Sequence, residues 1–234
     1  MEEKRVCLVT GVGEGTGASL CRRFAAGGYA VAMLARSGAR LAELARGISG
    51  ARPFAVDVAD ADALRQVLAE VREEIGPVEV AIHNAGAAAF GDVLQVSASQ
   101  LEEAWRVNVL ALFVLGQELG GEMAERGSGA ILATGATASL RGGAGFAAFA
   151  PAKAAQRSLI QSMARALGPR GVHVGYVVVD GVIDLPRTRR LFSGRPDEDF
   201  LRPDAIAEAF YFLAHQDRSA WTLELDLRPF TERF

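Results

Sequence analysis

Short apolar runs alternate along the chain with longer segments in which apolar residues recur every three or four positions. Most of the short runs are apolar throughout, which is typical of strands buried on both faces of a parallel sheet. On this basis the sequence predicts strands over residues 5–10, 30–35, 52–56, 78–83, 130–134, 172–179 and 222–226.

The longer segments have the periodicity of amphipathic helices. Ser97 with Gln100, or Ser99 with Glu102, offers a capping box for a long helix that continues through Leu115. Helices are predicted over residues 16–26, 41–46, 60–75, 97–115, 146–167 and 203–215. Because strand and helix alternate, we expect an α/β fold: a doubly wound, Rossmann-like parallel sheet with helices on both faces, in a single domain over residues 1–234.

The composition of the chain disfavours several classes of function. The chain has 234 residues, half of them apolar, and a net charge of −3, so nucleic acid and anionic membranes are poor candidates for partners. The longest apolar run, residues 107–116, is too short to span a bilayer, and the first residues lack the apolar stretch of a signal peptide. Cys7 and Cys21 lie in apolar segments and are expected to be buried free thiols, which favours a cytoplasmic location. No cluster of Cys, His and Asp predicts a metal site.

A glycine-rich turn follows the first predicted strand. Alternate glycines let backbone N–H groups approach an anion, and the start of the next helix adds its positive end. This setting, a strand followed by a glycine loop and a helix, is the one that a dinucleotide fingerprint requires. The candidate phosphate-binding residues are Gly11, Gly13, Gly15, Thr16 and Gly17.

The residues after the second strand bear on which dinucleotide is bound. Cofactors without a 2′-phosphate usually meet a carboxylate here, but the chain has Arg36 and Ser37 and no acid before Glu43. An arginine can hold a phosphate by two parallel hydrogen bonds, although a solvated loop arginine is the alternative. Glu14 in the glycine loop would repel a phosphate. On balance we expect NADP(H) rather than NAD(H).

Together these residues resemble the short-chain dehydrogenase/reductase family, and the resemblance covers essentially the whole chain. Its landmarks occur in order: Thr10 with the glycine loop, then Asp57-Val58, Asn84-Ala85-Gly86, Asn108 and Lys153. The resemblance implies a seven-stranded parallel sheet, a nicotinamide cofactor across the carboxyl ends of the strands, a small-molecule substrate, and a homodimer or homotetramer. It also implies that Asp57 and Val58 flank the adenine, that Asn84, Ala85 and Gly86 lie beneath the adenosine ribose, and that Lys153 holds the nicotinamide ribose.

The catalytic part of the family pattern is absent. The family has a Tyr four residues before the Lys and a Ser thirteen residues before that Tyr, and here these positions are Phe149 and Ala136. Hydride transfer to a carbonyl leaves an alkoxide, which the Tyr protonates in the family. Loss of a positioned general acid costs roughly 10² to 10⁴ in rate. Loss of a donor that polarises the carbonyl costs on the order of another 10² to 10³.

Other residues remain as candidates for the chemistry. Gly181 and Ile183 fit the family's cofactor loop after the sixth strand, whereas Asp180 replaces its Pro and Leu185 its Thr. Asp180 could act as an acid or base or could cap the loop backbone, and Lys153 could donate a proton or only bind ribose. Asn108 is expected to stabilise a helix backbone or an ordered water. Thr134 and Thr137 could supply a hydroxyl, and His83 and His173 are expected to be structural.

Three hypotheses follow. The first is an NADP(H)-dependent oxidoreductase with altered proton delivery, acting on a small carbonyl, an alcohol or an activated double bond. The second is a catalytically silent dinucleotide-binding sensor or scaffold, and the third a domain for another nucleotide-like ligand such as a methyl donor. Residues 185–201 are expected to form a lid over the substrate, and the apolar segment 221–234 to lie in a subunit interface.

Overall fold

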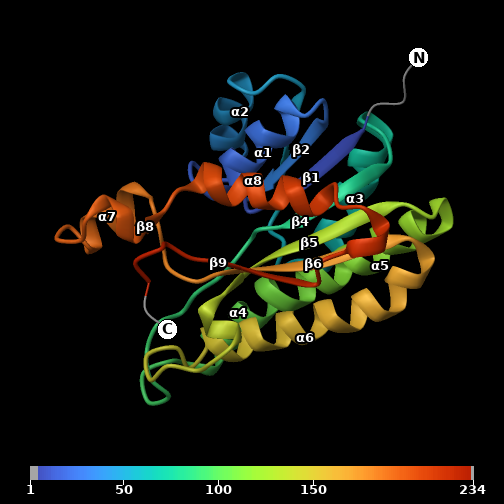
Figure 1. Ribbon diagram of the computed structural model, residues 1–234. Coiled ribbons are helices and arrows are strands. Elements are labelled where there is room, and N and C mark those ends of the chain that lie inside the picture. Colours follow the sequence, from blue (N-terminus) through green and yellow to red (C-terminus); the bar gives the residue numbers. More distant parts are fainter. Residues whose placement is uncertain (1–4, 233–234) are drawn as a thin grey trace.

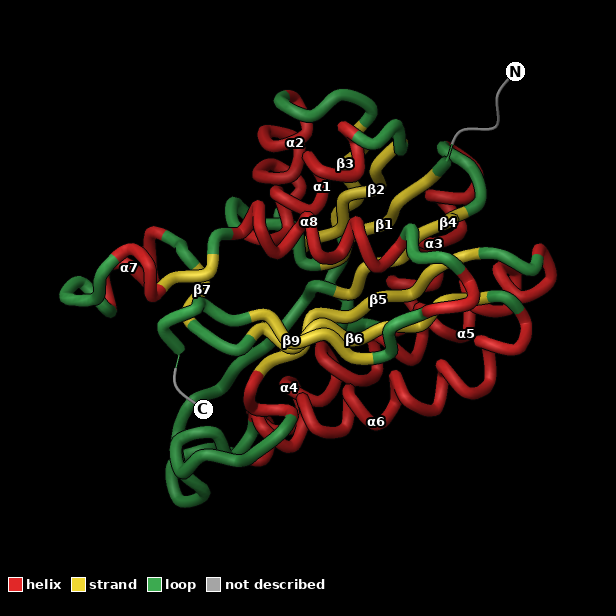
Figure 2. Tube along the Cα trace, viewed as in Figure 1, coloured by secondary structure: helices red, strands yellow, loops and turns green. Residues whose placement is uncertain are grey.

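A seven-stranded sheet lies at the centre of the computed structural model, which describes residues 5–232 (Figures 1 and 2). Its strand order is β3-β2-β1-β4-β5-β6-β9, and every neighbouring pair is parallel. The strands are β1 (Val6–Thr10), β2 (Ala30–Ala35), β3 (Ala51–Ala55), β4 (Val78–His83), β5 (Gly129–Ala136), β6 (Val172–Val179) and β9 (Glu224–Leu227). The predicted fold is confirmed, and the predicted strand ends differ by at most two residues.

Helices cover both faces of the sheet. One layer consists of α1 (Thr16–Ala26), α2 (Gly38–Arg46) and α8 (Pro203–Ala214), and the other of α3 (Ala61–Glu74), α4 (Ala98–Trp105), α5 (Ala111–Arg126) and α6 (Phe149–Leu167). Successive side chains of a strand point to opposite faces. Val6 and Leu8 therefore join the core beneath α3, α5 and α6, while Cys7 and Val9 join the core beneath α1 and α8. Both cysteines are buried free thiols, as predicted.

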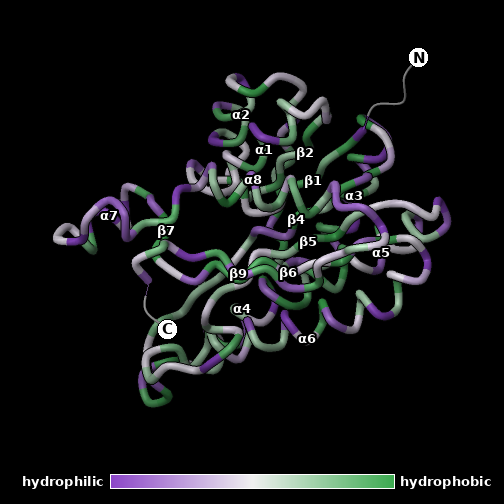
Figure 3. Tube along the Cα trace, in the orientation of Figure 1, coloured by the Kyte–Doolittle hydropathy of each residue, from purple (hydrophilic) through white to green (hydrophobic). Residues whose placement is uncertain are grey.

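The strand β3 departs from the expected pattern. It is one of the two edge strands of the sheet, with Arg52 and Pro53 exposed and only Phe54 buried. Proline has no N–H to donate to a ladder, so an edge is where a strand tolerates it. Figure 3 shows the contrast between hydrophobic central strands and the outer helices, where hydrophilic residues recur.

The long helix predicted from Ser97 is present but interrupted. Its start is the capping box of Ser97 and Gln100, with Gln100 N–H donating to Ser97 Oγ at 3.2 Å and Ser97 N–H donating to Gln100 Oε1 at 2.9 Å. A π-helical turn over Arg106–Leu110 then separates α4 from α5. The side chain of Asn108 donates to the carbonyl of Ala104 at 2.7 Å, which competes with the regular backbone ladder and accounts for the irregular turn.

The helix α6 begins three residues later than predicted. The backbone before it is used in a loop contact, in which Gly91 N–H donates to Gly145 O at 2.8 Å and Ala147 N–H donates to Gly91 O at 3.1 Å. These bonds form an isolated bridge between Gly91 and Phe146, flanked by turn residues, so the helix begins after it.

The segment expected to be a lid has secondary structure of its own. It contains α7 (Pro186–Leu191) and β8 (Phe200–Leu201), which pairs in parallel with β7 (Val182–Ile183), and it projects from the body of the molecule in Figure 1. The carboxylate of Asp184 anchors α7 by accepting two hydrogen bonds from Arg189, at 2.7 and 2.8 Å.

Part of the C-terminal segment packs against the rest of the chain. β9 completes the sheet, and the indole of Trp221 stacks on His173 with ring centroids 4.9 Å apart. Phe230 remains 86% exposed. The last two residues of the predicted interface segment, 233 and 234, lie outside the described part, as do residues 1–4 of the predicted domain. Across residues 5–232, none of the helices combines the length and the apolar character needed to cross a bilayer.

Candidate active site

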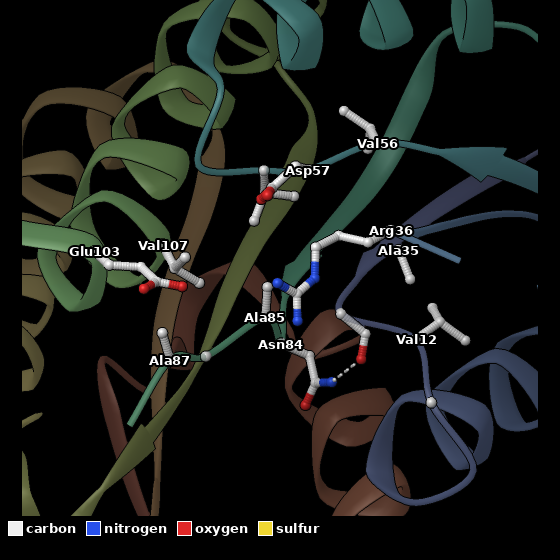
Figure 4. Close-up of a pocket in the computed structure, with 14 residues that line it drawn as sticks. Val12, Ala35, Arg36, Val56, Asp57, Asn84, Ala85, Ala87, Glu103 and Val107 are labelled. Atoms are coloured by element: carbon white, nitrogen blue, oxygen red, sulfur yellow. Dashed lines mark hydrogen bonds between the residues drawn. The ribbon is translucent and has the colours of Figure 1, made fainter. Parts of the chain in front are cut away.

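A cavity of about 520 Å³ lies at the carboxyl ends of β1, β2, β3 and β4 (Figure 4). Parallel strands end at the same edge of a sheet, and loops at this edge form the usual ligand crevice of a doubly wound fold. The cavity brings together predicted residues from four separate parts of the sequence: Gly11, Gly13, Arg36, Asp57, Val58, Asn84, Ala85 and Gly86. It also contains residues that the sequence did not indicate: Val12, Ala35, Val56, Ala87, Glu103 and Val107.

The glycine loop is shaped by close backbone contacts. Gly11 has a φ of +67°, and a Cβ at this position would lie 2.4 Å from Cα of Ala85. A Cβ at Gly17 would lie 2.7 Å from Cα of Val12, whereas a Cβ at Gly13 would meet nothing within 4 Å. Gly11 and Gly17 are therefore required by the fold, and Gly13 leaves open space on the cavity side.

The start of α1 fits an anion. The N-cap residue is Gly15, which has no side chain to satisfy the first N–H groups of the helix. The hydroxyl of Thr16 is buried and has no hydrogen-bond partner in the described structure. No side chain caps this first turn, and the positive end of the helix dipole favours an anion there, so the loop fits the pyrophosphate of a dinucleotide.

A buried hydrogen-bond network fixes β4 against the glycine loop. Thr10 Oγ1 accepts from the N–H groups of Asn84 and Ala85, at 3.2 and 3.1 Å, and lies 3.1 Å from Nδ1 of His83. Burial lowers the pKa of His83 to about 3, so its ring is neutral. The Thr10 hydroxyl then donates to Nδ1, and Nε2–H donates to the carbonyl of Val107 at 3.0 Å. His83 thus has the structural role that the sequence predicted.

The Arg36 side chain extends across the cavity between Asp57 and Asn84 in Figure 4. Ser37 caps α2 by accepting from Arg40 N–H at 3.4 Å. The guanidinium of Arg40 in turn pairs with Glu14 at 2.9 Å, which the sequence did not indicate. This ion pair offsets the negative charge that Glu14 brings to the loop, so the electrostatic objection to a bound phosphate is weakened.

A second cavity, of about 430 Å³, opens over the carboxyl ends of β5 and β6. It lies along the same edge of the sheet as the first, beyond β4 in the strand order. Its floor is formed by the ends of the two strands, where Ala136 pairs with Val179 and is followed by Thr137. The further lining residues are Phe90, Ala138, Arg141, Gly142, Gly143, Phe146, Phe149, Asp180, Gly181, Val182, Arg195 and Glu232.

Asp180 accepts a short hydrogen bond in this cavity. The Thr137 hydroxyl donates to Asp180 Oδ1 at 2.5 Å, and Nε of Arg228 lies 4.0 Å from Oδ2. Within residues 5–232 the hydrogen bond that the carboxylate accepts comes from the Thr137 side chain. It faces the cavity that also contains Phe149 and Ala136, the two positions where the family hydroxyls are missing.

Lys153 is buried on the inner side of α6, with 4% of its surface exposed. Its Nζ donates to the carbonyl of Thr134 at 2.9 Å and to Gln156 Oε1 at 3.0 Å, and it lies 5.8 Å from the ring centroid of Phe149. Burial disfavours the charged form and lowers the pKa of Lys153 to about 7.

Gln156 connects Lys153 to Asn108, and the sequence did not indicate it. The Gln156 amide donates to the main-chain carbonyl of Asn108 at 2.9 Å, and its Oε1 also accepts from the Tyr176 hydroxyl at 3.3 Å. The Asn108 side chain donates to the carbonyls of Ala104 and Ala87, and its Oδ1 is buried without a partner in the described structure. Asn108 thus bonds the helix backbone at the irregular turn, while its unpartnered Oδ1 is left for the other role expected for it, an ordered water. Spacing could have indicated Gln156, because residues three apart on a helix are neighbours.

The loop after β6 places the last predicted residues differently. Gly181, with a φ of +150°, lines the second cavity, whereas Ile183 pairs with Leu201 in the small sheet and lines neither cavity. Leu185 lies directly over the glycine loop, since a Cβ on Gly15 would be 2.2 Å from its Cδ2. In this arrangement the Leu185 side chain lies over the loop that would receive the pyrophosphate.

The buried lysine gives a testable pH dependence. The pKa of Lys153 falls from 10.5 in the unfolded chain to about 7 in the folded protein. Below pH 7 the amine is charged in both states, and there its burial destabilises the folded protein most. The free energy of unfolding of the wild type, relative to Lys153→Met, is therefore expected to rise between pH 7 and pH 10.5, by up to about 1.4 kcal/mol per pH unit. Urea titrations of both proteins across this range measure the difference, and parallel curves would contradict the expectation.

Comparison with known proteins identifies the family. The sequence matches the family model described as short chain dehydrogenase over residues 5–195. The chain belongs to the short-chain dehydrogenase family. It is 31% identical over 223 residues to galactitol 2-dehydrogenase (L-tagatose-forming) of Cereibacter sphaeroides, covering 88% of this chain and 86% of that protein.

Solved structures of the family superpose on the chain. A short-chain dehydrogenase from Rhodopseudomonas palustris has a TM-score of 0.83 and 36% identity, covering 97% of this chain and 99% of the other. A metagenomic short-chain oxidoreductase in complex with NADP also has a TM-score of 0.83, with 25% identity and coverage of 96% and 97%. The predicted membership of the short-chain dehydrogenase family is confirmed.

Proposed function

We propose that the protein is an NADP(H)-dependent oxidoreductase with altered proton delivery. The observation that carries this proposal is the pair of cavities along one edge of the sheet. The first joins the glycine loop to Arg36 and Asn84, and the second lies beside Phe149 on the helix that carries Lys153. A dinucleotide has two halves joined by a pyrophosphate, and this arrangement supports the placement of one half in each cavity.

The residues present fit such a cofactor. The amides at the start of α1 would hold the pyrophosphate, and Arg36 with Ser37 would hold a 2′-phosphate. Asp57 and Val58 would flank the adenine, Asn84–Gly86 would support its ribose, and Lys153 would bind the nicotinamide ribose. Of the remaining predicted contacts, Gly181 lines the substrate side and Ile183 supports the loop from the small sheet. When bound, the nicotinamide supplies a hydride.

We assign the exchange of a proton with the substrate to Asp180 and Thr137. They hold a proton between Thr137 Oγ1 and Asp180 Oδ1 in the cavity that contains Phe149 and Ala136. Lys153 and Asn108 are the other catalytic candidates. Lys153 Nζ donates to the Thr134 carbonyl and to Gln156, which leaves the third N–H of its ammonium for a ribose hydroxyl. The Asn108 side chain donates to the carbonyls of Ala87 and Ala104. These contacts support a binding role for Lys153 and a structural role for Asn108.

Titration of the wild type with NADPH, followed by calorimetry, tests the cofactor assignment. We expect micromolar binding, and NADPH oxidation with a panel of carbonyls, enones and imines measures turnover. Absence of binding to both NADPH and NADH at millimolar concentration would refute the proposal. Tight binding with no turnover on any substrate would favour the second candidate, a silent sensor or scaffold, which the loss of both family hydroxyls supports.

Arg36 is expected to decide the cofactor preference. Replacement by Leu removes the charge that faces the first cavity, and it should raise the Kd for NADPH about 10- to 100-fold while changing the Kd for NADH less than about threefold. Arg46→Leu is the matched control, because Arg46 is exposed in the last turn of α2. An equal loss of affinity for both nucleotides would contradict the role of Arg36 as a 2′-phosphate ligand.

Assembly and location complete the proposal. We propose that the protein forms a homodimer or homotetramer, since large apolar side chains remain exposed on α8 and beyond β9, including Phe212 at 60% and Phe230 at 86%. We also propose that it is located in the cytoplasm. Sedimentation equilibrium measures the assembly directly, and a monomer at micromolar concentration would contradict it.

A further inference from the structure

Three phenylalanines surround the second cavity. The ring of Phe90 meets Phe146 edge-on with centroids 5.5 Å apart, and it lies 6.0 Å from Phe149. Phe146 and Phe149 are 6.4 Å apart. Phe90 is 60% exposed and Phe146 38% exposed, so their rings are open to a ligand. The rings come from the loop after β4, the loop before α6 and the first residue of α6. Only the folded chain brings these three rings together.

The cavity combines these rings with a carboxylate. Asp180 stands at the end of β6, and the hydroxyl hydrogen of its neighbour Thr137 is directed at Oδ1 of Asp180. Arg228 Nε lies 4.0 Å from Asp180 Oδ2, and the same guanidinium binds Asp226 at 3.0 Å, so its positive charge is shared between two carboxylates. The lining of the cavity therefore combines a carboxylate with three aromatic rings.

The positive side chains of the lining are exposed to solvent. Arg141 and Arg195 are both exposed, and the guanidinium of Arg195 lies over the ring of Phe192 at 5.2 Å. Glu232 lines the cavity as well. Lys153, the other nearby cation, is bound to Thr134 and Gln156 beneath α6.

We propose that this cavity binds a cationic nitrogen compound, an iminium ion or the amine that corresponds to it, as its substrate. A cation over aromatic faces and beside a carboxylate is stabilised, whereas the oxyanion that forms during carbonyl reduction would be repelled by Asp180. The absence of hydroxyls at positions 149 and 136 agrees with this substrate class, because no oxyanion has to be stabilised or protonated.

The hydride step itself needs no proton donor, so with this substrate class Asp180 acts through its charge and the proton that it shares with Thr137 stays in place. The inference rests on the proposed function for its reductant, a reduced nicotinamide. Hydride addition forms a C–H bond at the iminium carbon and breaks one at the nicotinamide. The π electrons of the C=N bond become the lone pair of the amine, and the positive charge passes to the oxidised nicotinamide ring. In the reverse direction Asp180 would stabilise the cation as it forms.

The test compares two ligands of similar shape and different charge: 2-methyl-3,4-dihydroisoquinolinium, an iminium cation, and 1-tetralone, a neutral ketone. Calorimetric titrations use the wild type with and without saturating NADP+, so that binding is read independently of turnover. We expect the cation to bind at least about tenfold more tightly than the ketone. In a parallel assay the cation should oxidise NADPH, and the ketone should not.

Two variants test which residues cause the preference for the cation over the ketone. Asp180→Asn keeps the size of the side chain and an acceptor for Thr137, and it should weaken cation binding about tenfold while leaving ketone binding within about twofold. Phe146→Leu keeps an apolar wall and should weaken cation binding about threefold more than ketone binding. The control is Glu198→Gln, which removes a charge of the same sign from an exposed turn outside the cavity wall.

Equal affinity for the two ligands, or a cation affinity that Asp180→Asn leaves unchanged, would overturn the proposal. These outcomes are separate from failure of the proposed function. If the wild type binds neither NADPH nor NADH, the function fails, and the preference for the cation is still measured on the nucleotide-free protein. If NADPH binds and the cation is not preferred, only the substrate class fails.

Discussion

The double variant Phe149→Tyr, Ala136→Ser is expected to raise kcat/KM for NADPH-dependent reduction of 1-tetralone by about 10² to 10⁴. Both positions line the second cavity, and position 149 lies one helical turn before Lys153. The new phenol would stand where the ring centroid is now 5.8 Å from Lys153 Nζ, close enough for the ammonium to favour the phenolate. The new serine would add a donor for the substrate oxygen.

The rate should rise only for the ketone, whose reduction forms an oxyanion. Reduction of the iminium cation should change by less than about threefold, because a tyrosine ring keeps the aromatic face and no oxyanion forms. Phe113→Tyr is the matched control for the added hydroxyl, since Phe113 lies on α5 with 45% of its surface exposed. Steady-state rates on both substrates measure the effect. A double variant that binds NADPH normally but reduces tetralone no faster would mean that residues 149 and 136 do not face the reacting carbon.

Gly11→Ala is expected to lower the free energy of unfolding by about 3 kcal/mol or more. Two costs add: a non-glycine residue at a φ of +67° is strained, and its Cβ would lie 2.4 Å from Cα and 2.6 Å from N of Ala85. Both contacts are with backbone, so they can be relieved only by separating the glycine loop from β4. That movement would also disturb the bonds that Asn84 and Ala85 donate to Thr10.

Gly13→Ala is the matched control for this prediction. It lies in the same loop, and its Cβ would meet nothing within 4 Å. Urea denaturation should show a change of less than about 0.5 kcal/mol for this variant. NADPH affinity should still fall, because the methyl group would stand where the pyrophosphate must approach the backbone. Equal destabilisation by the two substitutions would show that close approach to Ala85 does not decide the effect.

The order of elements and the first cavity were predictable from the sequence because their signals are local. A strand buried on both faces is apolar throughout, as in β1 and β6, and a glycine loop between a strand and a helix has a specific spacing. Val6 and Cys7 are neighbours in sequence and enter opposite cores, which is a property of any extended chain. The residues after the second strand gave Arg36 as a phosphate ligand, and the family resemblance gave Asn84; both line the first cavity.

The chemistry of the second cavity was decided by the tertiary structure. Phe90 and Phe146 lie in loops without periodicity, and only the loop contact between Gly91 and Gly145 brings them together. The hydrogen bond between Thr137 and Asp180 depends on β5 and β6 ending side by side, and the pairing of Arg40 with Glu14 depends on α2 packing beside the glycine loop. The sequence by itself determined the fold, the family landmarks and the missing hydroxyls, since each is a local pattern of residue types. The partners of Asp180, Lys153 and Glu14 are set by long-range packing, which no local pattern encodes.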